Sequence, residues 1–122
     1  MALLKSGEDY LEVILTLSKK QAEIHAIDIV NELNYSKPSV SIALKKLKEK
    51  GYIEIDNQSH IHLTEAGLDI ATSIYERHKL LTDILIHIGV PKDIAEDDAC
   101  KIEHDLSDTT FNALKKYYEN IK

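Results

Sequence analysis

The sequence predicts a mainly α-helical protein with one β-hairpin in its first half, and three observations lead to this fold class. Over most of the 122 residues, apolar side chains recur at intervals of three and four, which is the spacing of a helix face. Two short runs, 52–55 and 60–63, instead alternate apolar and polar residues on either side of a polar turn. All four glycines stand near the predicted ends of helices, where glycine is common.

Three helices are predicted before the hairpin. Apolar spacing predicts the first at 6–19 and the second at 26–33. The third opens at Lys37 and Pro38, because proline is tolerated in a first helical turn, and ends at Gly51. Three helices and a hairpin in this order predict an N-terminal winged helix-turn-helix, in which the third helix enters the major groove of DNA and the hairpin wing flanks it.

Three more helices are predicted after the hairpin. A long helix runs from about residue 65 to Ile88 with His78 on its apolar stripe, another is predicted at 92–106, and the last follows Ser107. The stripe of the long helix consists of Ala66, Ile70, Ile74, Leu81, Leu85 and Ile88. The apolar residues of the next helix are Ile94, Ala95, Ala99, Ile102 and Leu106. The second half is therefore expected to be helical throughout.

Charge is distributed unevenly along the chain. The formal net charge of -6 alone argues against a nucleic-acid binder, because phosphate contacts require lysine and arginine. Residues 36–50 nevertheless contain five lysines and one glutamate, whereas residues 91–109 contain seven acids and two lysines. The first segment suits an anionic partner and the second a cation.

The expected compartment follows from what the sequence lacks. No run approaches the roughly 18 uncharged apolar residues of a membrane span, and charged residues interrupt the N-terminus. We therefore expect a cytoplasmic protein without a signal peptide. In that reducing compartment the single cysteine, Cys100, stays a thiol that is available for packing, metal binding or catalysis.

The third predicted helix has a buried seam and a polar outer face. Val40, Leu44 and Leu47 form the seam, and the turn of about 100° per residue points the other positions outward. The first turns would approach base edges and the lysines would follow phosphates. The alternative is a solvated lysine face on an ordinary helix, but the preceding helix and following hairpin favour DNA. The predicted DNA-binding residues are Ser36, Lys37, Pro38, Ser39, Ser41, Ile42, Lys45 and Lys46.

The segment DACKIEH, residues 98–104, contains the only cysteine and a candidate metal site. On a helix Cys100, Glu103 and His104 share one face, because they stand at positions i, i+3 and i+4. Thiolate, carboxylate and imidazole are suited to divalent transition metals. A metal ion of this kind requires four to six ligands, and one helix supplies three at most. The remaining ligands must therefore come from other parts of the chain.

The sequence offers three further ligand candidates. Asp9 and Glu12 lie three residues apart in the first predicted helix, and His78 lies on the long one. Each candidate has a structural alternative: solvated acids at a helix start, a hydrogen-bonded core histidine and, for Cys100, a small buried hydrophobe. A nucleophilic pair of Cys100 with His104 is a further alternative. It requires an oxyanion hole, for which the sequence shows no donor cluster, so we do not expect an enzyme.

Five motifs in order make the sequence resemble the diphtheria-toxin-repressor family of metal-dependent bacterial transcription repressors, and the resemblance extends from Gly7 to Ile121. The motifs are E-D-Y-L-E at 8–12, S-K-P-S-V-S at 36–41, L-T-E-A-G at 63–67, R-H-K-L-L at 77–81 and A-C-K-I-E-H at 99–104. The resemblance implies a homodimer that binds a palindromic double-stranded DNA operator. It also implies a DNA-binding domain at 1–64 and a helical metal-binding and dimerisation domain at 65–122.

The resemblance implies one ligand set, which agrees with the candidates above: Asp9, Glu12, His78, Cys100, Glu103 and His104. The length, without an SH3-like domain, and Asp9 resemble the manganese-responsive branch, whereas Cys100 resembles the iron-responsive branch. Carboxylates suit Mn(II) and a thiolate adds preference for Fe(II) and later metals, so Fe(II) is slightly favoured over Mn(II). We expect one or two ions per subunit, with other divalent transition metals as substitutes, and no organic cofactor.

Two positions depart from the family pattern. Thr82 stands where the iron branch has a second-site glutamate, which predicts an impaired second site. Ile42 stands where the best-known iron repressor has glutamine. An aliphatic side chain can contact a thymine methyl group but cannot hydrogen-bond adenine, which predicts a different operator.

The sequence thus predicts a metal-dependent DNA-binding repressor of metal-homeostasis genes that responds to Fe(II) or Mn(II). The alternative is a winged-helix regulator that senses a small organic ligand or a protein partner. In that alternative, residues 98–104 only pack in a dimer.

Overall fold

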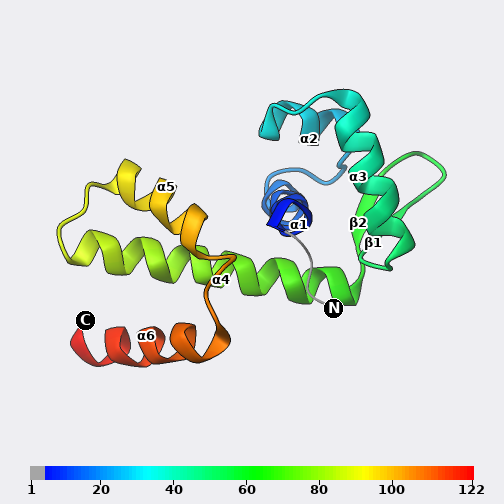
Figure 1. Ribbon diagram of the computed structural model, residues 1–122. Helices are drawn as coiled ribbons and strands as arrows, with labels where there is room; N and C mark the ends of the chain where they lie inside the picture. Colours follow the sequence, from blue (N-terminus) through cyan, green and yellow to red (C-terminus); the bar gives the residue numbers. More distant parts are fainter. Residues whose placement is uncertain (1–4) are drawn as a thin grey trace. The chain divides into compact units, whose positions relative to one another are not determined.

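The computed structural model describes residues 5–122, with side chains from residue 7 onward, and Figure 1 shows their arrangement. Helices dominate this part of the chain, and its one β-sheet is a two-stranded antiparallel hairpin, as predicted. The elements are α1 (Lys5–Ser18), α2 (Ala26–Leu33), α3 (Lys37–Glu49), β1 (Ile53–Ile55), β2 (Ile61–Leu63), α4 (Glu65–His87), α5 (Lys92–Ile102) and α6 (Asp108–Ile121). None of the described helices is long and apolar enough to cross a membrane.

The chain forms two compact units, one up to Thr72 and one from Ser73. We call them unit 1 and unit 2. Because the division falls within α4, this helix contributes residues to both. The domain boundary predicted between residues 64 and 65 stays a prediction.

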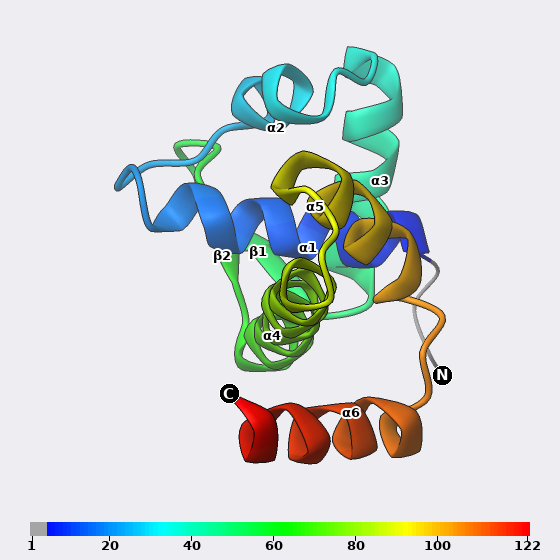
Figure 2. The same ribbon diagram turned by 90° about the vertical axis from the view of Figure 1, so that its left-hand side faces the viewer.

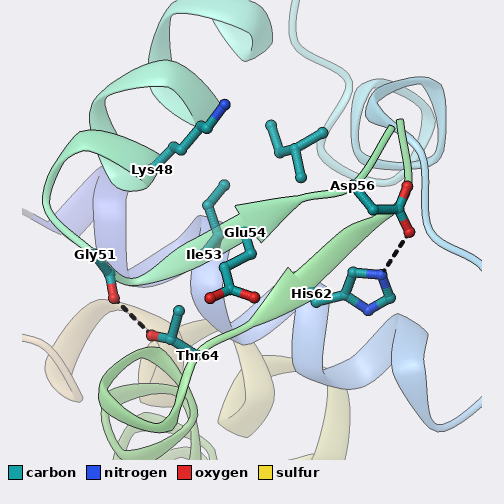
Figure 3. A pocket seen from close by; sticks show the side chains of 8 residues that line it. Lys48, Gly51, Ile53, Glu54, Asp56, His62 and Thr64 are labelled. Atoms are coloured by element: carbon teal, nitrogen blue, oxygen red, sulfur yellow. Dashed lines mark hydrogen bonds and ion pairs between the residues drawn. The ribbon is translucent and has the colours of Figure 1, made fainter. Parts of the chain in front are cut away.

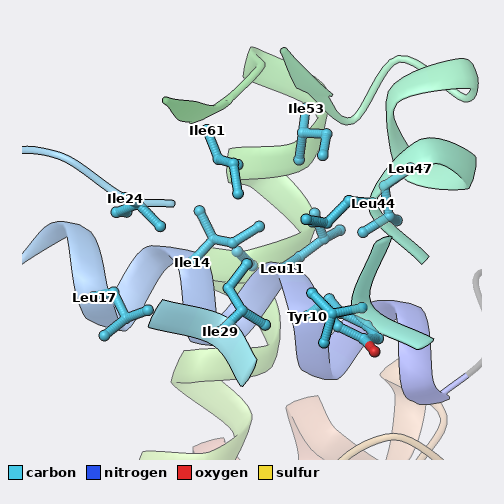
Figure 4. Close-up of a cluster of buried hydrophobic side chains, with 12 residues drawn as sticks. Tyr10, Leu11, Ile14, Leu17, Ile24, Ile29, Leu44, Leu47, Ile53 and Ile61 are labelled. Carbon is cyan, nitrogen blue, oxygen red and sulfur yellow. The ribbon is translucent and has the colours of Figure 1, made fainter. Parts of the chain in front are cut away.

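Unit 1 is a winged helix-turn-helix whose core forms around α1. The side chains of Leu11 and Ile14 are almost completely buried against residues from α2, α3 and the hairpin, as Figure 4 shows. Burying one such aliphatic side chain contributes about 1.5–3 kcal/mol. The predicted seam of α3 belongs to this core and consists of Val40, Leu44 and Leu47. The core therefore fixes which face of α3 is left for a partner.

Local signals set the ends of α3 and the position of the hairpin. Ser36 is the N-cap of α3, since its side chain accepts a hydrogen bond from the Ser39 backbone N–H at 3.2 Å. Gly51 follows the helix with φ of 82°, a conformation that favours glycine. The backbone N–H of Ile61 donates to the carbonyl oxygen of Ile24 at 2.8 Å. This bond ties β2 to the segment before α2 and so holds the wing next to the helices.

Gly67, in the first turns of α4, allows this helix to approach the hairpin closely. A Cβ atom at this position would lie 2.0 Å from the carbonyl oxygen of Tyr52. That carbonyl oxygen also accepts the backbone N–H of Thr64 at 3.1 Å. The contact is between backbone segments, so it cannot be relieved by a side-chain rotation.

We expect the Gly67→Ala change to destabilise the protein by about 1–2 kcal/mol. In an exposed helix the same change stabilises by about 1 kcal/mol, but here the methyl group would overpack against backbone, which typically costs about 1–3 kcal/mol. Urea unfolding followed by circular dichroism measures the difference. The control is Ala66→Gly at the exposed neighbouring position, which should lose only about 1 kcal/mol from helix propensity. A Gly67→Ala variant as stable as the wild type would contradict this account.

Unit 2 has the later part of α4 at its centre, and Figures 1 and 2 show α5 and α6 on opposite sides of this helix. The small side chains of Ala95 and Ala99 are the buried residues of α5. Ile94 and Ile102, which the sequence places on the same apolar face, are 49% and 37% exposed. The buried face of α5 is therefore narrower than predicted.

Two further predictions for this unit were wrong in detail. Helix α5 ends at Ile102 rather than at residue 106, because the backbone N–H of Asp105 bonds the carbonyl oxygen of Ile102, three residues back, instead of continuing the α-helical pattern. The predicted stripe of α4 is also displaced at both ends, since Ala66 is exposed and Ile88 is 69% exposed beyond the helix. The buried residues of α4 are Gly67, Ala71, Ile74, Arg77, Leu81 and Thr82.

Candidate DNA-binding surface and metal centre

The outer face of α3 is available to a partner along its whole length. All eight predicted DNA-binding residues, Ser36, Lys37, Pro38, Ser39, Ser41, Ile42, Lys45 and Lys46, are exposed. Ile42 is 58% exposed, which is unusual for a large aliphatic side chain. The hydroxyl groups of Ser36 and Ser39 lie 2.8 Å apart at the helix start. The face thus combines small polar groups in its first turn with one apolar residue and two lysines further along.

The turn of the hairpin is organised by Asp56, which the sequence analysis did not single out. Its carboxylate accepts the backbone N–H groups of Gln58 and His60, both at 2.9 Å, and lies 3.0 Å from Nε2 of His62, as Figure 3 shows for His62. His60 Nδ1 lies 3.5 Å from the same carboxylate. The hydrogen bond with His62 and then that with the His60 backbone lower the pKa of Asp56 to about 2. An aspartate at the start of a predicted turn was the available signal.

We expect the wing turn to lose order as the pH falls from about 4 to about 2. The folded pKa of Asp56 lies below its ordinary value of 3.8, so its contribution to stability is present above pH 4 and disappears as the carboxylate is protonated. A His62→Ala change should raise the pKa of Asp56 towards 3.8, whereas Gln58→Ala should not, because Gln58 donates through its backbone. The carboxyl-carbon chemical shift of Asp56 against pH measures this, and equal midpoints in the two variants would oppose it.

Unit 1 contributes two of the predicted metal ligands, both from α1. Asp9 and Glu12 are half-buried and each offers a carboxylate oxygen within 4.8 Å of the other. Tyr10 and Leu11 between them are buried in the core of the unit. The core residues therefore fix the direction of the helix face that carries the two carboxylates.

Three of the other predicted ligands lie together in unit 2, namely Glu103, whose carboxylate is buried, and His78 and His104 beside it. The side chain of Glu103 is completely buried. One of its oxygens, Oε2, lies 2.8 Å from Nδ1 of His78 on α4. The other, Oε1, lies 3.3 Å from Nε2 of His104, whose side chain is 2% exposed. Cys100, one turn before His104, is half-buried.

This arrangement fits a divalent transition metal. A fully buried carboxylate is costly unless a cation or hydrogen bonds compensate it, and Glu103 Oε1 accepts no hydrogen bond from the described residues. The side chains beside Glu103 are imidazoles, which are common metal ligands. Carboxylate, imidazole and thiolate together form a mixed donor set of intermediate hardness. Among the described residues, Glu103, His78, His104 and Cys100 can supply these donors in unit 2.

One buried residue of this region was missed in the sequence analysis. Arg77 precedes His78 in the R-H-K-L-L motif and is 7% exposed. Its guanidinium group bonds the backbone of Glu103, one of the predicted ligands, at 3.2 Å. The available signal was an arginine located between the apolar residues Ile74 and Leu81 on the long helix.

Comparison with known protein families decides the family. The model of the iron-dependent repressor N-terminal DNA-binding domain matches residues 2–61, and the model of the iron-dependent repressor metal-binding and dimerisation domain matches residues 64–122. The chain belongs to the iron-dependent repressor family. This confirms the resemblance that the five motifs indicated. Like the family, the chain is a metal-dependent DNA-binding transcriptional repressor with a dimerisation domain.

Individual relatives of this chain are regulators as well. An HTH-type transcriptional regulator of Methanocaldococcus jannaschii is 33% identical over 97% of this chain and 96% of its own length. The transcriptional regulator MntR of Escherichia coli is 33% identical over 90% of this chain and 71% of its own. The solved structure of the manganese regulator SloR has a TM-score of 0.81 and 31% identity, over 98% of this chain and 55% of that one.

These comparisons confirm the winged helix-turn-helix fold and the expectation that the metal is iron or manganese. They also favour the metal-dependent repressor over the alternative regulator of an organic ligand or protein partner. The chain spans about half the length of the solved SloR chain. The individual metal ligands and DNA contacts stay predictions.

Proposed function

We propose that this repressor acts in the cytoplasm as a homodimer on a palindromic operator of metal-homeostasis genes, and that Fe(II) or Mn(II) raises its operator affinity. The observation that carries the proposal is the buried carboxylate of Glu103 between His78 and His104. The same chain also has an exposed face with polar residues and lysines on α3, the recognition helix of the winged helix-turn-helix. We propose a regulatory function and no enzymatic one.

The proposed DNA contacts follow from the exposed face of α3. Ser39, Ser41 and Ile42 in the first turns approach base edges. Ile42 favours thymine, because its aliphatic side chain can contact the methyl group of that base. Lys45 and Lys46 contact phosphates, which position the protein without reading sequence. Ser36, Lys37 and Pro38 approach the DNA backbone at the helix start, where the positive end of the helix dipole favours an anion.

We propose that the metal ligands are Asp9 and Glu12 in unit 1 and His78, Cys100, Glu103 and His104 in unit 2. A bound divalent cation would supply positive charge that offsets the carboxylates. Without it, the carboxylates of Asp9 and Glu12 repel each other within α1, since their oxygens are close. The thiolate of Cys100 favours Fe(II) and the carboxylates favour Mn(II), so both metals remain candidates.

The homodimer is supported by the surface of unit 2. Ile88, Ile94 and Ile102 are exposed by 69%, 49% and 37%, although large aliphatic side chains are usually buried. We propose that a second copy of the chain covers these residues, in keeping with the dimerisation domain of the family.

An operator-binding titration tests the proposal. Selection from random double-stranded DNA in the presence of Mn(II) first defines the operator. Fluorescence anisotropy then measures the affinity in parallel with anaerobic Fe(II), Mn(II), Zn(II) and excess chelator. We expect a palindromic operator and tight binding only with Fe(II) or Mn(II). Equal affinity in chelator and in saturating metal would remove the proposed mechanism.

A further inference from the structure

Arg77 is a buried cation whose hydrogen bonds within the described part of the chain go to residues 103–108 of unit 2. Its guanidinium group donates to the carbonyl oxygen of Glu103 at 3.2 Å and to that of Leu106, and it forms an ion pair with Asp108. The guanidinium carbon also lies 5.1 Å from the centre of the Phe111 ring. Burying a charged group is costly unless it is paired, and this group has both hydrogen bonds and a counter-charge.

The segment that Arg77 holds has little regular structure of its own. Helix α5 ends at Ile102 and α6 begins at Asp108, so residues 103–107 connect two helices. Glu103 and His104 lie at the start of this connection. The backbone N–H of Glu103 donates to the carbonyl oxygen of Ala99 and so attaches the start of the segment to α5. The carbonyl oxygens of Glu103 and Leu106 accept hydrogen bonds from Arg77, which attach the segment to α4.

The same helix that supplies Arg77 also supplies the next residue, His78, which lies 2.8 Å from the Glu103 carboxylate. Arg77 therefore bonds the backbone of Glu103 while its neighbour bonds the side chain. The two contacts together fix the backbone and the carboxylate of Glu103 relative to α4. Nη1 of the guanidinium group donates to both carbonyl oxygens and Nη2 to the carboxylate of Asp108, and a lysine ammonium group does not offer this planar fork of donors.

We propose that Arg77 is a positioning residue for metal binding, which holds Glu103 and His104 in their ligand geometry through the backbone of residues 103–106. This role rests on the proposed function of these two residues as metal ligands. Arg77 itself does not bind the metal, because a guanidinium group has no acceptor and carries a positive charge. Its removal is expected to weaken metal binding and to change the ligand field, while leaving operator affinity in chelator unchanged.

The test compares the wild-type chain with Arg77→Met, Arg77→Lys and the control Lys79→Met, which removes an exposed cation from the same helix. Isothermal titration with Mn(II) gives the metal affinity, and the absorption spectrum of the Co(II)-loaded protein reports the ligand geometry. We expect Arg77→Met to lose about 10- to 100-fold in Mn(II) affinity and to shift the Co(II) spectrum, as for other groups that orient ligands. Arg77→Lys should recover part of both, and Lys79→Met should match the wild type.

Several outcomes would overturn the proposal. A folded Arg77→Met with wild-type Mn(II) affinity and Co(II) spectrum removes the positioning role alone. Absence of Mn(II) and Co(II) binding in both the wild type and Lys79→Met removes the proposed metal function as well. If Arg77→Met does not fold, Arg77→Lys decides: wild-type affinity and spectrum in that variant overturn the role, and reduced affinity with a shifted spectrum supports it.

Discussion

Replacement of Glu103 by glutamine is expected to abolish the metal response of operator binding. The change keeps the shape of the side chain but removes the buried carboxylate that lies between His78 and His104 in unit 2. Loss of a group that merely orients a ligand costs about 10- to 100-fold in metal affinity, so loss of a charged ligand should cost at least about 100-fold. Titration with Mn(II), by calorimetry and by operator binding, measures both effects.

The stability of the metal-free variant separates this effect from misfolding. A buried carboxylate is expensive, whereas a neutral amide of the same size is less so, so Glu103→Gln should be at least as stable as the wild type in chelator. Only the rise of the melting temperature on adding Mn(II) should disappear. Asp105→Asn, which changes an exposed acid two residues later, is the matched control and should behave as the wild type. A metal response that survives in Glu103→Gln would show that Glu103 is no ligand.

The double change Lys45→Gln with Lys46→Gln is expected to weaken binding to every DNA sequence. Each phosphate contact that is lost makes the dependence of log affinity on log salt shallower by about 0.9, so the slope should fall by about 2 for each bound subunit. At near-physiological salt this corresponds to a loss on the order of 30-fold for each subunit. Anisotropy titrations between low and moderate salt measure the slope and the affinity together.

Sequence preference provides the check on this interpretation. Because phosphate contacts do not read bases, the ratio of operator to random-DNA affinity should change little. The matched control is Lys115→Gln with Lys116→Gln, an adjacent exposed pair on α6 that changes the net charge equally. An equal loss in the control would mean that net charge, rather than the face of α3, determines the affinity.

The recognition helix was predictable because its inward and outward positions follow from a single period. Val40, Leu44 and Leu47 are spaced for one helix face, whereas Ile42, the other large aliphatic residue of this helix, lies off that face and is exposed. The hairpin was predictable from two alternating runs and a turn sequence. Asp56 was not recognised, since its effect depends on a histidine six residues away that only the paired strands bring close.

Unit 2 was predicted less accurately because its sequence has more apolar positions than its buried face can use. Ile94 and Ile102 fit the same helical pattern as Ala95 and Ala99, but only the alanines are buried. Helix α5 ends at Ile102, where the Asp105 N–H bonds the carbonyl oxygen three residues back, and Arg77 binds two carbonyl oxygens of the connection that follows. Arg77 lies 26 residues before Glu103 in the sequence, and no local signal at residues 103–106 indicates this contact.

For the candidate metal ligands, some features were predictable from the sequence and others were not. The convergence of Glu103 and His104 was predictable from their place in the DACKIEH segment, and the contact of His78 with Glu103 was expected from the family resemblance. The sequence shows that the candidate ligands include both a thiol, Cys100, and a carboxylate, Asp9. Which metal the site prefers depends on the binding free energy that each ligand contributes, and residue types alone do not give these energies.

The central claim is that operator binding and metal binding are coupled, and the Mn(II) affinity with and without bound operator tests it most directly. A protein whose DNA-binding state rises from about 1% to about 99% on metal binding gains about 100-fold in operator affinity, and linkage requires the operator to tighten metal binding by the same factor. We predict a Mn(II) dissociation constant that is lower by about that factor when operator is bound. The same dissociation constant with and without operator would contradict the account.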